Sequence, residues 1–63
     1  MPTITVAMIE GRTLDQKRQL VTEITKDVCD ICKVQPEAVS VRFEEMRRED
    51  FAKGGTLYSD QGK

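Results

Sequence analysis

The order of hydrophobic patterns along the chain restricts its fold more than any other feature. Residues 3–9 (TITVAMI) alternate between larger apolar and smaller side chains, which is the period of a half-buried strand. Residues 39–46 alternate in the same way. Between these stretches, apolar residues recur at the spacing of one helix face: Leu20, Val21, Ile24, Val28 and Ile31. A strand, a helix and a strand in this order predict a βαβ unit with two parallel strands.

Local signals set the ends of the predicted helix. Thr13 and Gln16 have the spacing of a capping box, in which each side chain accepts a hydrogen bond from the backbone of the other residue. Pro36 disfavours helical backbone at the residue before it. We therefore expect a helix from Leu14 to about Lys33.

The last part of the chain is typical of a loop followed by a hairpin. Residues 47–50 predict a charged loop, and Gly54-Gly55 predicts a turn between two short strands at 51–52 and 56–58. Residues 59–63 predict a frayed tail. The expected fold class is α/β (α+β), a single domain over residues 1–63 with one βαβ unit and a short C-terminal hairpin, assembled as an oligomer.

Chain length is the reason to expect an oligomer. A chain of 63 residues hides only about 60% of the surface that its unfolded form exposes. Domains below about 70–80 residues usually need disulfides, a metal or partner subunits, and this sequence has two cysteines and no histidine. One helix covers one face of a two-stranded sheet, so we expect a further copy of the chain to cover the other face.

Composition excludes several kinds of partner. Ten Lys+Arg and eleven Asp+Glu are mixed along the chain, without the basic stripe that nucleic acid requires. No apolar run reaches the roughly 20 residues that span a membrane, and the start of the chain lacks the order of a signal peptide. We expect a soluble, cytoplasmic protein with neither a nucleic-acid nor a membrane partner.

The lack of histidine turns attention to the start of the chain as a source of a general base. Methionine aminopeptidases remove Met1 when the next residue is small, and this would expose the secondary amine of Pro2. A terminal amine has a lower pKa than a lysine amine, and apolar walls or nearby arginines lower that pKa further because both disfavour the charged form. Many chains begin Met-Pro by chance, so the dipeptide needs support from other residues.

Two arginines provide such support. Arg12 follows the first predicted strand at a glycine, and Arg42 lies on the second, on the face opposite Val41 and Phe43. Guanidinium groups bind carboxylates through paired hydrogen bonds and can stabilise an oxyanion. A carboxylate or keto-acid substrate suits this set of groups. An ion pair with a nearby glutamate is the alternative for each arginine.

Cys29 and Cys32 match the C-x-x-C redox pattern. They fall in the last turns of the predicted helix, where the helix dipole does not favour a thiolate. A zinc site would need two further ligands. We expect two part-buried free thiols and no metal site.

Several stretches in a fixed order resemble one known family. A proline follows Met1, EGRT leads into the helix, DQK lies in its first turn, and EEM, an aromatic residue and a glycine pair follow. Over nearly its whole length, the sequence resembles the small tautomerases of the 4-oxalocrotonate tautomerase (2-hydroxymuconate tautomerase) family.

This resemblance implies a mechanism and an assembly. In the family, the amine of the terminal proline, here Pro2, moves a proton between carbons of a 2-hydroxydienoate such as 2-hydroxymuconate. Arg12 would bind a substrate carboxylate, and Phe51 would keep the pocket apolar. The family uses no metal or organic cofactor, and it is typically a homohexamer, a trimer of dimers, with sites built from neighbouring subunits. Such enzymes belong to aromatic hydrocarbon catabolism.

One position departs from the family pattern. Ser40 stands where the best-known members have a second arginine, and Arg42 lies on the same face of the strand about 6.5 Å away. Either Arg42, with Ser40, replaces that substrate-binding group, or Arg42 forms a surface ion pair. The substrate therefore stays open between 2-hydroxymuconate, a phenylpyruvate-type or other keto acid, and a haloacrylate. A non-catalytic oligomeric binding module on the same scaffold is the alternative outside the enzymes.

Overall fold

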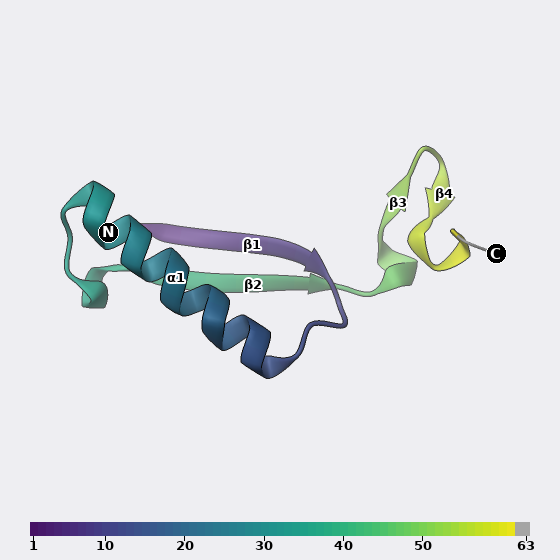
Figure 1. The fold of residues 1–63 in the computed structure, drawn as a ribbon. Coiled ribbons are helices and arrows are strands. Elements are labelled where there is room, and N and C mark those ends of the chain that lie inside the picture. Colours follow the sequence, from purple (N-terminus) through teal and green to yellow (C-terminus); the bar gives the residue numbers. More distant parts are fainter. Residues whose placement is uncertain (62–63) are drawn as a thin grey trace.

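The computed structural model describes residues 1–61 and confirms the predicted order of elements (Figure 1). Strand β1 (Thr3–Ile9) leads into helix α1 (Leu14–Cys32), and strand β2 (Ser40–Met46) follows. A short 3-10 helix at Pro36–Ala38 joins α1 to β2, and another, Arg48–Asp50, follows β2. Within the described residues, no helix is both long and apolar enough to serve as a membrane span.

The sheet of the βαβ unit has two parallel strands, β1 and β2. Thr3 pairs with Ser40 and Ile9 pairs with Met46, so the two strands begin together and end together. The Ser40 N–H also donates to the carbonyl of Pro2 at 3.0 Å, which attaches the start of the chain to the second strand. One end of the sheet therefore carries both amino ends of the strands, and the other end carries both carboxyl ends.

Alternation divides the strand side chains between a face covered by α1 and an uncovered face. The half-buried apolar residues beneath the helix are Ile4, Val6, Met8, Val41 and Phe43. At the end of this face, Lys17 on α1 forms an ion pair with Glu45 on β2. The exposed residues of the uncovered face are Thr3, Thr5, Ala7, Ser40, Arg42 and Glu44. The predicted alternation of both strands is thus confirmed.

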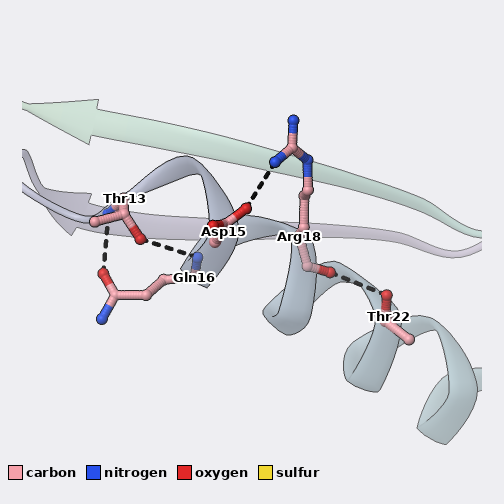
Figure 2. Close-up of polar contacts among 5 residues, drawn as sticks. All are labelled: Thr13, Asp15, Gln16, Arg18 and Thr22. Carbon is pink, nitrogen blue, oxygen red and sulfur yellow. Dashed lines mark hydrogen bonds and ion pairs between the residues drawn. The ribbon is translucent and has the colours of Figure 1, made fainter.

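Helix α1 begins at the predicted capping box (Figure 2). The backbone N–H of Gln16 donates to Thr13 Oγ1 at 3.1 Å, and the N–H of Thr13 donates to Gln16 Oε1 at 2.9 Å. Two of the unpaired amides at the start of the helix are satisfied in this way. The helix ends at Cys32, one residue before the predicted end, because Lys33 takes a left-handed conformation (φ 58°) and its N–H donates to the Cys29 carbonyl.

Beyond β2 the chain forms the predicted hairpin, with strands β3 (Ala52–Lys53) and β4 (Thr56–Leu57). Its turn uses Gly54 (φ 63°) and Gly55 (φ 84°), conformations that favour glycine because a side chain would be strained there. Figure 1 shows this hairpin beyond the carboxyl end of β2, away from the helix.

The expectation of a frayed tail is wrong for residues 59–61. A 3-10 helix (Tyr58–Asp60) continues from β4, and the Gln61 side-chain amide donates to the Thr56 carbonyl at 3.3 Å. The Tyr58 N–H donates to the Phe51 carbonyl at 2.7 Å, and the two rings meet edge to face at 6.2 Å. These contacts hold the segment against the hairpin. Residues 62 and 63 lie outside the described part of the chain.

A single subunit has no buried core. None of residues 1–61 is fully buried, and Ile31 on the predicted apolar face of α1 is 79% exposed. The radius of gyration is 15.1 Å, whereas a compact domain of this length has about 11 Å. The accessible surface is 5010 Å², compared with about 4100 Å² for a compact monomer of this mass. The subunit therefore has the shape of a part of a larger assembly.

Replacing Thr13 with alanine should lower the free energy of unfolding by about 1 kcal/mol per subunit, because the Gln16 amide loses its acceptor. Thr22→Ala is the matched control. The Thr22 hydroxyl only donates back to the Arg18 carbonyl at 3.0 Å, and alanine is the better helix former. Denaturation followed by circular dichroism at one protein concentration checks both variants, and equal effects would contradict the role of the cap.

The uncovered face should be an interface between copies of the chain. We expect sedimentation equilibrium to give a multiple of the subunit mass, and the unfolding midpoint to rise with protein concentration. Ala7→Asp should dissociate the assembly, because it places a carboxylate on this face opposite Glu44. Thr22→Asp, an exposed position on α1, serves as the control. A monomeric wild-type protein would contradict the expectation.

Candidate functional site

Pro2 lies at the amino end of the sheet. Its ring is half-buried, and its carbonyl is held by the Ser40 N–H at 3.0 Å. Met1 in front of it is 94% exposed, so a peptidase has access to the Met1–Pro2 bond in the subunit. Ser40 on the neighbouring strand lies next to Pro2, as the alignment of the strands requires.

Arg12 lies at the opposite end of the sheet, after the carboxyl end of β1. Gly11 precedes it with φ 122°, a conformation that favours glycine. No hydrogen bond or ion pair joins the Arg12 side chain to any of residues 1–61, so the described residues do not support the alternative of a surface ion pair. Arg12 lines an open hollow of about 300 Å³, together with the apolar side chains of Met8 and Leu20 and with polar side chains of α1, which are Gln16, Lys17, Gln19 and Glu23. An unpaired guanidinium beside apolar surface suits a ligand with a carboxylate and an apolar body.

Arg42 has a different environment. It lies on the uncovered face of β2 with Ser40, and its Nη2 is 3.9 Å from Glu44 Oε1. The two side chains are 67% and 55% exposed, so water screens this ion pair strongly. This weak pair leaves both alternatives for Arg42 as predictions.

Phe51 lies just before β3, at the carboxyl end of the molecule, and its ring is exposed. Pro2 lies at the other end, and the seven residues of β1 separate the two ends by about 20 Å. One subunit therefore does not bring Pro2 together with Arg12 or Phe51 (Figure 1).

Two further arginines follow β2. Arg47 contacts two carboxylates, Glu49 at 3.0 Å and Asp50 at 2.9 Å, and the hydrogen bond to Asp50 raises the pKa of Arg47. Arg48 instead lies over the Tyr58 ring, with 5.1 Å between Cζ and the ring centroid. The sequence predicts only a charged loop at residues 47–50, without this contact. The feature of the sequence that could have indicated this contact is the Gly54-Gly55 turn, because it brings Tyr58 back toward Arg48.

The cysteines show no site. Cys29 is half-buried as expected, whereas Cys32 is exposed because it lies where α1 ends, and both are free thiols. Among the described residues, no group of three or more His, Cys, Asp or Glu side chains could hold a metal ion.

Comparison with known proteins shows the family of the chain. The family model described as "Tautomerase enzyme" matches residues 2–61. A probable tautomerase from Listeria monocytogenes is 43% identical over 60 residues, which cover 95% of this chain and 98% of the relative. The 2-hydroxymuconate tautomerase of Bacillus subtilis is also 43% identical, over 95% of this chain and 97% of its own.

Solved structures agree on the fold. A crystal structure of a 4-oxalocrotonate tautomerase homologue superposes with a TM-score of 0.95 at 35% identity, and the match covers 100% of both chains. The chain therefore belongs to the tautomerase family, whose members are isomerases.

Proposed function

We propose that this isomerase moves a proton in carboxylate-bearing enols and 2-hydroxydienoates, with 2-hydroxymuconate as the reference substrate. The observation that carries the proposal is Arg12, which has no ion-pair or hydrogen-bond partner in the described residues and lines an open hollow beside Met8 and Leu20, in a chain of the tautomerase family. The proposed base and acid is the Pro2 amine, once Met1 has been removed. With Met1 attached, the Pro2 nitrogen is an amide and cannot accept a proton.

The proposed mechanism needs the side chains of this chain alone. The neutral amine of Pro2 takes the proton of the 2-hydroxyl group of the substrate and returns it to a carbon of the diene. The O–H bond breaks, a C–H bond forms, and the C–O bond becomes the carbonyl of an α,β-unsaturated ketone. Arg12 binds a substrate carboxylate and stabilises the negative charge of the dienolate formed between the two transfers. Phe51 excludes water, which favours the uncharged amine. No metal or organic cofactor takes part in this scheme.

In this proposal the site is completed by more than one subunit. Pro2 and Arg12 lie at opposite ends of β1, so a substrate that reaches both must bind between copies of the chain. One subunit supplies Pro2 with Ser40 and Arg42 near it, and another supplies Arg12 and Phe51. The uncovered face and the two free strand edges supply the surfaces for a homohexamer, a trimer of dimers. The two free thiols suit the reducing cytoplasm, where we place the enzyme.

A second candidate substrate is a monoacid enol of the phenylpyruvate type. The observation that favours it lies at the Pro2 end of the sheet. Ser40 carries no charge there, and Arg42 is paired with Glu44. A comparison of mono- and dicarboxylate substrates distinguishes the two candidates.

Replacement of Pro2 with alanine should lower kcat/KM for the ketonisation of 2-hydroxymuconate by about 100-fold or more, because the primary amine that remains at the start of the chain lacks the ring that holds the lone pair in a fixed direction. Thr3→Ala, one residue further on, is the control and should keep most of the activity. Intact mass must show that Met1 is absent from each preparation. Equal rates for wild type and Pro2→Ala would end the proposal for Pro2.

Arg12→Ala should raise KM for the same substrate about 10- to 100-fold, because a hydrogen bond to a charged group contributes about 1.5–3 kcal/mol. Arg18→Ala is the matched control, since Arg18 is bound to Asp15 at 2.7 Å on the exposed first turns of α1 (Figure 2). The same KM and the same kcat for wild type and Arg12→Ala would remove Arg12 from the site.

A further inference from the structure

The arginines fall into two groups by their partners. Three of the five form ion pairs: Arg18 with Asp15, Arg42 with Glu44, and Arg47 with Glu49 and Asp50. Arg12 and Arg48 form none with any of residues 1–61. An arginine that no carboxylate of its own subunit neutralises keeps its charge and its donors available for an anion.

These two arginines lie at the same end of the sheet. Arg12 follows the carboxyl end of β1, and Arg48 follows the carboxyl end of β2. The parallel register brings those ends together, and the Glu10 N–H donates to the Met46 carbonyl at 2.9 Å just beyond them. Ligands of open sheets with parallel strands commonly bind at this edge.

Arg48 is oriented by an aromatic contact that leaves its donors free. Its guanidinium lies over the Tyr58 ring at 5.1 Å, and Tyr58 in turn contacts the Phe51 ring at 6.2 Å. A cation–π contact with a ring uses none of the hydrogen-bond donors of a guanidinium in an ion pair, so the N–H groups of Arg48 can still bind a carboxylate. The neighbouring Arg47 already braces the loop through Asp50 and Glu49, so Arg48 is not needed for that purpose.

We propose that Arg48 is a second carboxylate-binding residue of the site and binds the second acid group of a dicarboxylate such as 2-hydroxymuconate. Arg12 binds one carboxylate and Arg48 binds the other, while Phe51, linked to Arg48 through Tyr58, contacts the unsaturated carbons between them. This arrangement supplies a second cation at the end of the sheet that carries Arg12, whereas Arg42 lies on the uncovered face near the Pro2 end, 3.9 Å from the exposed carboxylate of Glu44. The inference rests on the proposed function for the type of reaction. The two carboxylates of the substrate are inferred from the two arginines that form no ion pair.

The kinetic test uses two dienols that differ by one carboxylate: 2-hydroxymuconate, a diacid, and 2-hydroxypenta-2,4-dienoate, a monoacid. Arg48→Gln should raise KM for the diacid by about 10-fold or more and change kcat and the monoacid KM less than about twofold. Arg48→Lys, which keeps the charge, should recover part of the diacid affinity. Arg47→Gln is the matched control and should affect both substrates equally, because it disturbs only the loop.

Three kinetic outcomes overturn the proposal. Equal effects of Arg48→Gln on both substrates would mean that Arg48 only supports Tyr58 and Phe51. No effect on either substrate would remove Arg48 from the site. A wild-type enzyme that prefers the monoacid would contradict the dicarboxylate.

A binding measurement keeps this inference separate from the proposed function. Calorimetry with muconate, a diacid without the reacting hydroxyl, should show weaker binding to Arg48→Gln than to wild type, and unchanged binding to Pro2→Ala. If Pro2→Ala keeps full activity while Arg48→Gln no longer binds muconate, the proposed base is wrong. The assignment of Arg48 to the second carboxylate then still holds. Equal muconate affinity for wild type and Arg48→Gln overturns the inference whatever the activity of Pro2→Ala.

Discussion

The parallel pairing of β1 with β2 is the constraint on which the rest of the structure depends. Because the strands start and end in register, one end of the sheet holds Pro2 and Ser40 and the other holds the segments that follow both strands. A base at one end and cations at the other cannot act on one small molecule within a subunit. The fold thus makes association a condition of the proposed chemistry as well as of stability.

The stability of the fold also requires that subunits associate, for a separate reason. The helix covers only one face of a two-stranded sheet, and even the residues beneath it stay half-buried. Local devices such as the capping box and the Lys17–Glu45 ion pair fix the shape of the subunit. They cannot replace a core, because a helix cap contributes about 1 kcal/mol and a partly exposed ion pair contributes less than about 1 kcal/mol, whereas ordering the backbone of one residue costs about 1–2 kcal/mol.

The structural features that depend on residues close together in the sequence were predictable. The bounds of β1 follow from strict alternation, and the start of α1 follows from Thr13 and Gln16. The partners of the arginines were not predictable, because they depend on which side chains the register and the hairpin bring together. Arg42 meets Glu44 two residues along one strand face, whereas Arg48 meets Tyr58 only after the glycine turn. The tail was predicted wrongly because Tyr58 anchors it.

The hairpin after β2 is built from contacts close in sequence. Phe51, Tyr58 and Arg48 lie within eleven residues of one another, and none needs the helix or a second chain for these contacts. Such short-range contacts close small loops and form early in folding. The hairpin that follows Phe51 can therefore be ordered before the subunits associate. Association then costs little additional conformational entropy in this segment.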